Sequence, residues 1–387
     1  MTNSILYTDE QKIQSRNSLD RMKQNENVCL KISYAPNFSE KNPYQRQLSN
    51  KLKELGIQIE GIDHRKFFLP ATVNRKNTDI LHLHWLQGYF RASNPISSLL
   101  KVVGFISGLA LLKFKGIKIV WTVHNLKHHE NLYPLSDSIC TSFVSKLADA
   151  IITHSYAAKS ELCQTFHVKD IKKVSVVPHG NYAEAYENNM SQLEARKLLK
   201  IPESSTVFLF FGMIRWYKGV PELIDAFKVL QSESTYLAIT GRFRDADEEL
   251  ADLIQKKVKD DKNIKLVTGF IPEKEVQVYM NACDAVLFPY RRLLTSGALI
   301  LAMSFRRACV APRIGCMEEI LDEAGGYLYD SSSGDGLVQA LESANDRKND
   351  LSQMGEYNYQ IAAEWSWETV AQMTLNVYQR CMEDDNS

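Results

Sequence analysis

Short apolar segments that alternate with helical stretches constrain the fold of this chain more than any other feature of its sequence. Such an alternation predicts parallel sheets with helices on their faces, because neighbouring parallel strands need a crossover connection, usually a helix. In the first half we expect a helix at Tyr44–Leu55, which ends at Gly56. The strands expected there cover Val28–Ala35, Ile57–Ile62, Asp79–His84, Lys118–Val123, Ala150–His154 and Val174–Pro178.

The same alternation begins again in the second half, after a polar segment between residues 180 and 204. The expected strands are Thr206–Phe211, Thr235–Thr240, Ile264–Val267, Ala285–Pro289 and Cys309–Pro312. The expected helices are Val220–Leu230, 245–260, Glu273–Cys283 and Gly297–Phe305. The sequence therefore predicts an α/β protein with two doubly wound halves, whose ligands bind beyond the carboxyl ends of the strands.

The composition supports two globular domains and excludes other classes of protein. At 387 residues the chain is too long for one ordinary core. Its 46 basic and 46 acidic residues balance, so a nucleic-acid binder, which needs a basic surplus, is not expected. The seven cysteines are scattered without a CxxC pair, and the N-terminus lacks a basic region followed by an apolar run. These features predict a cytoplasmic protein without a zinc site.

The segment FFGMIRWYKGVPELIDAF, residues 210–227, predicts a diphosphate site. An expected strand ends at Gly212, a short loop carries Arg215 and Lys218, and a helix begins near Gly219. Free N–H groups and the helix dipole favour an anion at such a helix start, and two cations neutralise it. Taken in isolation, the two cations are better explained as solvated loop charges.

Two further segments follow expected strands in the same half. In PYRRLLTSGALILAMSF (289–305), Ser296 and Gly297 open an apolar helix, where Ser caps free N–H groups and Gly lets a ligand approach the backbone. In APRIGCMEEIL (311–321), Glu319 is expected on a loop just after a strand, where it could accept hydrogen bonds from a ribose or sugar hydroxyl. The structural alternatives are a plain capped helix and acids that stabilise a helix start.

In this order, the segments resemble the nucleotide-sugar domain of GT-B glycosyltransferases, specifically glycosyltransferase family four. The resemblance rests on GMIRWYKG, GFIPEKEVQVYMNACDAVLFPYR, the TSGA helix start and the glutamate of the following turn. The first half agrees through NPYQ (42–45), DILHLHW (79–85), VWTVHN (120–125) and IITHS (151–155). The closing AEWSWETVAQMTLNVY (363–378) resembles the crossover helix of the family, so the resemblance covers about residues 28–380.

The resemblance implies a GT-B architecture, in which two Rossmann-like domains face a cleft. We expect a polar extension at 1–27, an N-terminal acceptor-binding domain at 28–183 completed by the crossover helix at 363–387, and a C-terminal nucleotide-sugar-binding domain at 184–362. The implied enzyme is a hexosyl-type transferase that needs no cofactor. It moves a sugar from a UDP- or GDP-sugar to an acceptor hydroxyl, on a glycan or lipid-linked glycan in bacterial surface-polysaccharide synthesis.

The resemblance also implies roles for individual residues. Arg215 and Lys218 match the positions that hold the donor diphosphate, and His124 matches the histidine beside the transferred sugar. The other donor-side matches are Gly212, Gly241, Phe270, Ile271, Ser296, Gly297 and Glu319. The acceptor-side matches are Asn42, Tyr44, His84 and Trp85.

The loop HNLKHHE, residues 124–130, follows an apolar strand and suits general-base chemistry on a hydroxyl nucleophile. His124, His129 and Glu130 are therefore candidate catalytic side chains. The alternative for each histidine is a surface or hydrogen-bonded ring. His82 and His84 share one face of a strand, but no carboxylate spacing accompanies them, so no metal site is expected.

One departure from the family concerns two glutamates that many members carry eight residues apart. Here the two positions are Leu293 and Leu301. The departure leaves open the transferred sugar and whether its configuration is retained or inverted. It also leaves two alternatives: a catalytically impaired protein that binds a nucleotide sugar or glycan, and an epimerase or phosphorylase on the same fold, although neither of these enzymes has its motif here.

The stretch from Ile80 to His129 contains six basic residues and no acidic one, and Ile96–Phe114 within it is nearly apolar. Lys101 interrupts that segment, so a membrane-spanning helix is not expected. One expectation is a buried helix that packs on the sheet. The other is an interfacial helix, with Arg91, Lys113 and Lys115 meeting anionic lipid at the inner face of the cell membrane.

Overall fold

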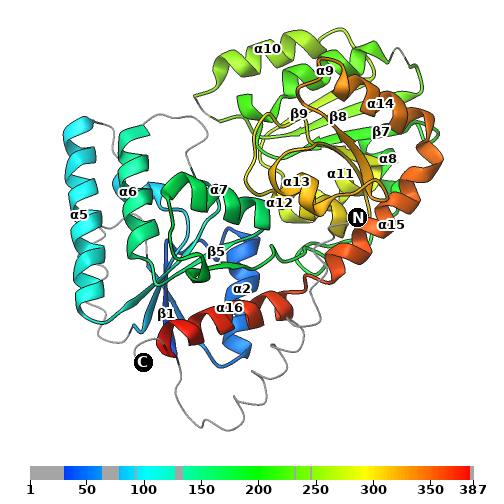
Figure 1. Cartoon of the computed structure of the whole chain (residues 1–387). Helices are drawn as coiled ribbons and strands as arrows, with labels where there is room; N and C mark the ends of the chain where they lie inside the picture. The colour runs from blue at the N-terminus through cyan, green and yellow to red at the C-terminus, as the bar shows by residue number, and fades with distance from the viewer. Residues whose placement is uncertain are drawn as a thin grey trace. The chain divides into compact units, whose positions relative to one another are not determined.

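The structure, a computed structural model, describes residues 30–62, 78–91, 94–126, 134–230, 232–244 and 246–383. The chain divides into two compact units (Figure 1). The N-terminal unit comprises Met1–Gly180 and Trp367–Ser387, and the C-terminal unit comprises Asn181–Ser366. The polar extension expected at 1–27 lies outside the described residues.

A parallel six-stranded sheet, ordered β2-β1-β3-β4-β5-β6, forms the centre of the N-terminal unit. Its strands are β1 (Lys31–Ala35), β2 (Gln58–Gly61), β3 (Ile80–Leu83), β4 (Lys118–Thr122), β5 (Ala150–Thr153) and β6 (Val174–Val176). The helices of the unit are α2 (Pro43–Glu54), α4 (Gln87–Phe90), α5 (Pro95–Phe114), α6 (Pro134–Leu147), α7 (Tyr156–Phe166) and α16 (Trp367–Glu383), with a 3₁₀ turn at Ile171–Lys173. Strands β3, β4 and β5 are buried along their whole length, as expected for parallel strands that are covered on both faces.

A second parallel six-stranded sheet, ordered β12-β11-β10-β7-β8-β9, forms the centre of the C-terminal unit. Its strands are β7 (Thr206–Phe211), β8 (Thr235–Gly241), β9 (Ile264–Thr268), β10 (Ala285–Leu287), β11 (Ala308–Pro312) and β12 (Gly326–Tyr329). The helices are α8 (Gln192–Leu199), α9 (Val220–Val229), α10 (Glu248–Val258), α11 (Val276–Ala282), α12 (Gly297–Ser304), α13 (Gly315–Ile320), α14 (Gly336–Asp346) and α15 (Leu351–Ala363), with 3₁₀ turns at Trp216–Lys218, Glu273–Glu275 and Lys348–Asp350. From the β9 edge this is the strand order of dinucleotide-binding folds, which reverses between β7 and β10.

The predicted α/β architecture with two doubly wound sheets is confirmed, and most predicted strands differ from the observed ones only at their ends. Several elements depart from the prediction, among them three in the C-terminal unit. The polar segment 180–204 contains α8, which begins with a capping box between Ser191 and Glu194. Glu319 lies on α13 and not on a loop, because the chain turns into a helix three residues after β11. Strand β12 was not expected at all.

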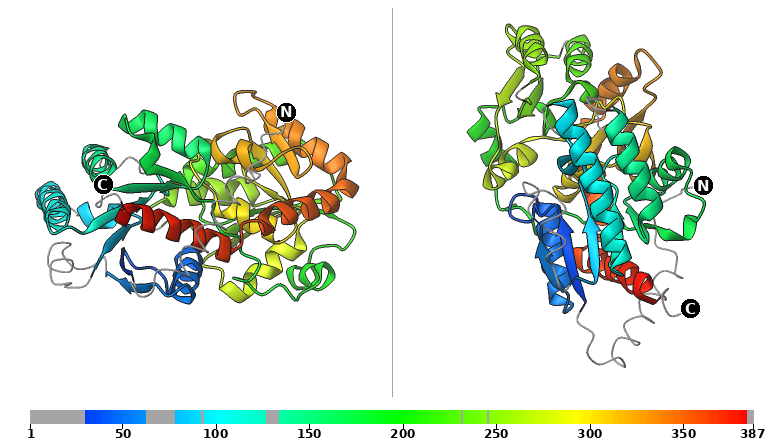
Figure 2. Two further views of the ribbon diagram at one scale, coloured as in Figure 1. Left: turned by 60° about the horizontal axis from the view of Figure 1, so that its bottom comes forward. Right: turned by 90° about the vertical axis from the view of Figure 1, so that its left-hand side faces the viewer.

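Helix α16, the last of the chain, belongs to the N-terminal unit, where it packs beside α2 (Figures 1 and 2). Its inner face buries Val370, Leu375 and Tyr378 completely. At its start the Trp367 ring covers Gly180, where a Cβ atom would come within 2.5 Å of the ring. The N-terminal core is therefore built from two distant parts of the sequence.

This packing predicts that Leu375→Ala destabilises the N-terminal unit by about 2–5 kcal/mol, because the truncation leaves a cavity under α16. Urea unfolding followed by circular dichroism measures the loss. Glu383→Ala, at an exposed position of the same helix, serves as the control and is expected to stay within about 0.5 kcal/mol of the original chain. Equal stability of the two variants would show that α16 is not part of the core.

Candidate active site

The reversal of strand order between β7 and β10 marks the expected ligand site of the C-terminal sheet. The loop after β7 carries Arg215 and Lys218, and the loop after β10 leads to the start of α12. The two loops touch: a Cβ atom on Gly219 would overlap the carbonyl oxygen of Pro289, and the φ angle of Gly219 is +63°. Only glycine fits this position, which brings the start of α9 against the end of β10.

Lys218 lies at the centre of this arrangement. Its Nζ atom is 5.0 Å from the ring centroid of Tyr290 and 5.9 Å from that of Phe210. It would lie 3.5 Å from a Cβ atom on Gly212, so the glycine leaves room beside the ammonium group. Burial lowers the pKa of Lys218 to about 8. An anion bound here would supply the counter-charge that favours the protonated lysine.

Gly212 and Gly241 end the neighbouring strands β7 and β8 in direct contact. Their φ angles are +120° and +156°, and a Cβ atom on Gly241 would overlap the carbonyl oxygen of Gly212. A parallel bridge between Ile214 and Phe243 continues the pairing beyond the strands. Glycine at both positions therefore lets the chain segments after β7 and β8 pack directly against each other.

The start of α12 contains two of the predicted donor-side residues, Ser296 and Gly297. Ser296 is the N-cap, and its hydroxyl accepts a hydrogen bond from the Leu299 N–H group at 3.2 Å. Gly297 is the first helical residue, and the helix interior is fully apolar. The backbone N–H groups of such a helix start favour an anion.

The remaining donor-side residues follow the other strands. Phe270 comes after β9 and is 77% exposed, whereas Ile271 packs against the core. Glu319, on α13, is half-buried. Leu293 packs against the same core and Leu301 is buried in α12, so the two positions that carry glutamate in many family members are here part of the hydrophobic interior.

In the N-terminal unit the structure gathers histidines at the carboxyl edge of the sheet. His84, His124, His154 and His179 follow the ends of β3, β4, β5 and β6 respectively. The ring of Tyr44 lies among them, with centroid distances of 6.2, 5.1, 5.3 and 4.9 Å. We call these four histidines and Tyr44 the histidine cluster.

Hydrogen bonds fix the rings of the cluster. His154 and His179 donate from Nδ1 to the carbonyl oxygens of Val177 and Gly180, at 2.9 and 2.8 Å, which leaves Nε2 of each ring without a proton when the ring is neutral. Nδ1 of His84 lies 3.3 Å from Nε2 of His124. Among the described residues, the buried Nε2 atoms of His84 and His154 make no hydrogen bond. Two buried ring nitrogens of the cluster therefore have hydrogen-bonding capacity that the described residues do not use.

Two aromatic side chains enclose the cluster. Trp85 stacks on His124, with ring centroids 4.3 Å apart and an interplanar angle of 12°. Trp367 of α16 lies 5.4 Å from Tyr44, centroid to centroid. Below them, His82 bonds to Tyr378 at 2.6 Å and to Thr122 at 2.7 Å, so both of its ring nitrogens are used within the core.

Burial keeps these histidines neutral. Burial, together with the neighbouring histidine rings, lowers the pKa of His82 and His179 to about 3, and burial lowers that of His154 to about 4. The pKa values of His84 and His124 are also well below 6.5, chiefly because of burial. Near neutral pH the cluster is thus a set of hydrogen-bonding groups and not a set of cations.

The predicted acceptor-side and catalytic residues therefore have different environments. Tyr44, His84, Trp85 and His124 come together, whereas Asn42 uses its side chain to cap α2 by accepting from the Gln45 N–H group at 3.3 Å. His129 and Glu130 lie outside the described residues. Within the described part of the chain, no group of three His, Cys, Asp or Glu side chains could hold a metal ion.

His154, His179 and Trp367 are site residues that were not predicted from the sequence. The first two could have been found by the argument used for His124, since each closely follows a predicted strand. Trp367 could be assigned to the cluster only from the packing of α16, because it is distant in the sequence from every histidine.

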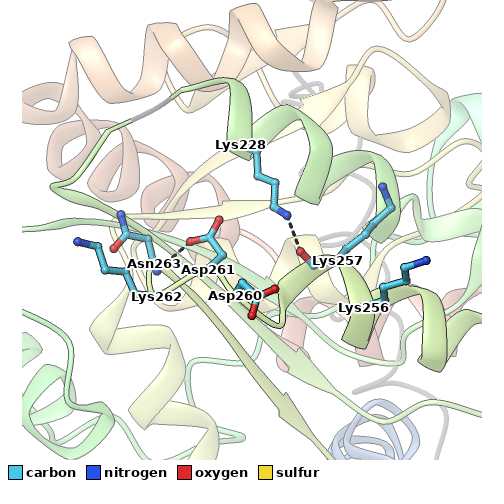
Figure 3. A pocket seen from close by; sticks show the side chains of 7 residues that line it. All are labelled: Lys228, Lys256, Lys257, Asp260, Asp261, Lys262 and Asn263. Atoms are coloured by element: carbon cyan, nitrogen blue, oxygen red, sulfur yellow. Dashed lines mark hydrogen bonds between the residues drawn. The ribbon is translucent and has the colours of Figure 1, made fainter.

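A surface pocket of about 500 Å³ lies elsewhere in the C-terminal unit (Figure 3). Its lining comes from the ends of α9 and α10 and the turn before β9: Lys228, Lys256, Lys257, Asp260, Asp261, Lys262 and Asn263. The pocket is therefore at the amino-terminal end of β9, opposite to the edge where the donor-side residues meet.

Two family models match the chain. Residues 100–181 match the model described as Glycosyltransferase Family 4, and residues 205–346 match the model described as Glycosyl transferases group 1. The first match covers part of the N-terminal unit, including His124, and the second covers every strand of the C-terminal sheet together with Arg215 and Lys218.

The chain is similar to curated proteins and to solved structures. A GDP-mannose:glycolipid 4-beta-D-mannosyltransferase of Xanthomonas campestris pv. campestris is 26% identical over 306 residues, which is 78% of this chain and 79% of that protein. A lipopolysaccharide 1,2-N-acetylglucosaminetransferase of Salmonella typhimurium is 29% identical over 51% of this chain and 54% of that protein. The crystal structure of HepE from Anabaena in complex with UDP and glucose superposes with a TM-score of 0.70, at 13% identity over 91% of this chain and all of that chain.

The buried histidines predict a loss of stability below pH 6.5. Because their pKa values are lower in the folded state than the ordinary 6.5, the unfolded chain binds more protons as the pH falls. At pH 5 each of His82, His154 and His179 costs ~2 kcal/mol of unfolding free energy. Urea unfolding of the N-terminal unit at pH 7.5 and pH 5 measures the difference.

His154→Gln is expected to reduce this pH-dependent loss by ~2 kcal/mol, because one titrating ring is removed. His167→Asn is the control: His167 is exposed and ends α7 in the left-handed conformation, which asparagine tolerates. If stability at pH 5 equalled that at pH 7.5, the histidines could not be buried as described.

Proposed function

This chain is a GT-B glycosyltransferase that depends on a nucleotide sugar, and from that premise we propose that it transfers a hexose to a lipid-linked glycan at the inner face of the cell membrane. The alternatives of an impaired binding protein and an epimerase are not favoured, because the relatives named above are transferases. The proposal concerns the donor, the acceptor and the residues that act on them.

The observation that carries the proposal is the contact of the loop that carries Arg215 and Lys218 with the segment after β10 that leads to α12, at the switch point of the C-terminal sheet. Two cations and two helix starts, those of α9 and α12, suit a donor diphosphate. During transfer the bond between the sugar carbon and the diphosphate breaks, and the electron pair leaves with the diphosphate. Arg215, Lys218 and the helix dipoles would stabilise that developing charge.

The histidine cluster supplies groups for the acceptor side. The acceptor oxygen forms the new bond to the sugar carbon, and its proton must pass to a base. His124 is our candidate for contact with the sugar or the acceptor hydroxyl, since it lies at the carboxyl edge of its sheet, stacked on Trp85 and beside His84. His84 is 1% exposed, so its role would be to orient His124 and not to touch a large acceptor.

The named activities of the relatives guide the choice of substrates. One relative is named for GDP-mannose and a glycolipid, and another for lipopolysaccharide. HepE was crystallised with UDP and glucose, so both UDP- and GDP-sugars belong in the test. We propose GDP-mannose as the donor and a lipid-linked sugar as the acceptor, because that relative aligns with 78% of this chain.

A panel of UDP- and GDP-sugars, each supplied with a bacterial lipid-linked acceptor extract, tests the proposal. We expect release of one nucleoside diphosphate and a matching gain in acceptor mass. Binding of a nucleotide sugar without hydrolysis or transfer from any donor in the panel would instead favour the impaired binding protein.

Arg215→Ala and Lys218→Ala are each expected to lower transfer by roughly a hundredfold, because charge-assisted phosphate contacts in an enclosed site are strong. Donor affinity by calorimetry and initial rates measure the effect. Lys256→Ala serves as a control with matched charge, because Lys256 lines the pocket on the opposite edge of the sheet. Near-original values for both site variants would exclude this diphosphate site.

His124→Ala is expected to lower the turnover number by at least roughly tenfold while nucleoside diphosphate affinity changes little, because its contact would be to the sugar or acceptor. Steady-state kinetics and nucleotide calorimetry separate the two quantities, and the thermal midpoint checks the fold. His167→Asn is again the control. A parallel loss of diphosphate affinity and turnover would contradict this role for His124.

A further inference from the structure

Helices α5 and α6 form a parallel pair on the outside of the N-terminal unit (Figures 1 and 2). Two ion pairs hold the pair together at its ends. Arg91, just before α5, bonds to Asp137 in the first turn of α6, with Nη2 and Oδ2 2.6 Å apart. Lys113, in the last turn of α5, pairs with Asp149, just after α6. The amino-terminal ends of the two helices therefore lie together, and so do their carboxyl-terminal ends.

The inner face of α5 belongs to the core of the unit. Phe105 and Leu109 are completely buried, and Val102 and Leu112 nearly so. Helix α5 is long and apolar enough to cross a membrane, but this packing makes it a helix of the N-terminal unit. Its inner face therefore agrees with the expectation of a buried helix that packs on the sheet. The buried face accounts for only part of its apolar side chains.

Six large apolar side chains remain on the outside of the pair, at its amino-terminal end. We call them the α5/α6 apolar patch: Ile96 (75% exposed), Leu99 (64%), Leu100 (61%), Val103 (57%), Leu135 (78%) and Ile139 (53%). On α5 they recur at intervals of three and four residues, so they form one stripe. Scattered exposed aliphatic residues are ordinary, but six at the amino-terminal ends of two adjoining helices suggest a binding partner.

The patch lies at the functional edge of its sheet. Helix α5 begins after the carboxyl end of β3, and α6 begins after the carboxyl end of β4. These are the same strand ends that carry His84 and His124. An apolar surface that binds at the patch would therefore lie at the edge of the unit that receives the acceptor.

The charged groups of the two helices are compatible with binding to a lipid surface. Electrostatic attraction would contribute little to that binding, because most of these groups already have partners. Asp137 is the only carboxylate within the two helices, and it is buried against Arg91. Arg91 and Lys113 are held in ion pairs, and Lys101 donates to the carbonyl oxygen of Arg91 at 2.7 Å. The expectation that Arg91 and Lys113 meet anionic lipid is therefore replaced by one in which the apolar side chains carry the binding.

We propose that the α5/α6 apolar patch docks the N-terminal unit on a lipid bilayer, with its aliphatic side chains in the boundary between headgroups and acyl chains. The proposal rests on the proposed function, in which the acceptor is attached to a lipid. A bilayer suits the patch because the two helices offer exposed aliphatic groups at this end and no exposed carboxylate. Docking would bring the carboxyl edge of the sheet to the membrane surface.

Flotation of the full chain with vesicles of phosphatidylcholine and phosphatidylglycerol tests the proposal. We expect the protein to float with the vesicles in low salt and to remain largely bound in 0.5 M NaCl, because apolar insertion is not screened by salt. The double variant Leu99→Ser/Leu100→Ser is expected to lower the vesicle partition coefficient at least roughly tenfold, since two exposed leucines no longer contribute. Leu198→Ser, at a leucine 62% exposed on α8 of the other unit, is the matched control.

Three outcomes would overturn the proposal. The original chain could stay at the bottom of the gradient, the double variant could float as well as the original, or binding could vanish in 0.5 M NaCl. A concentration-dependent dimer that the double variant abolishes, without vesicle binding, would assign the patch to a second copy of the chain. Hydrolysis of the donor sugar by the double variant, measured without vesicles, tests the proposed function separately, because the patch lies outside the donor-side and histidine-cluster residues.

Discussion

The contact between Gly219 and the carbonyl oxygen of Pro289 is the constraint on which the candidate donor site depends. It joins the beginning of α9 to the end of β10 across the point where the strand order of the C-terminal sheet reverses. Any side chain at Gly219 would push these segments apart, and with them Lys218 and the start of α12. The contact between Gly212 and Gly241 acts in the same way on the other side of β7. Backbone packing, and not side-chain contact, thus sets the geometry of this edge.

In both units, burial lowers the pKa of nitrogen-containing side chains at the candidate site. Burial lowers the pKa of Lys218 and of the clustered histidines, so each group is less readily charged than in water. In the proposed donor site of the C-terminal unit, an incoming diphosphate would favour the charged lysine. In the N-terminal unit an incoming hydroxyl can pair with a neutral ring without a charge being created. The chemistry expected from each unit therefore follows from how strongly its polar groups are desolvated.

Most of the fold could be predicted from the sequence because buried parallel strands are continuous apolar segments. Strand β7 was predicted at its observed bounds for this reason, whereas β12 was missed because three of its four residues are only half-buried and its apolar segment is short. Local signals also located Ser296 at the start of α12.

The environment of individual site residues was harder to predict, because it depends on partners far away in the sequence. Arg91 pairs with a carboxylate 46 residues later and Lys113 with one 36 residues later. The neighbouring sequence does not reveal these partners, so both side chains were expected to be free to meet lipid. Asn42 could equally cap a helix or meet a ligand, and only the backbone geometry at the start of α2 distinguishes the two. The histidine cluster became visible only when β3, β4, β5 and β6 were placed side by side.

Helix α16 completes a unit whose other part ends at Gly180, so the C-terminal unit is inserted into the N-terminal one. A ribosome that has translated as far as Ser366 has supplied every residue of the C-terminal unit, but the N-terminal sheet still lacks the helix that covers Tyr44 and His82. The N-terminal core therefore stays incomplete until α16 has been synthesised. A nonsense mutation early in the codons of α16 would leave the C-terminal unit intact and the N-terminal unit incomplete, a product suited to recognition by chaperones and proteases.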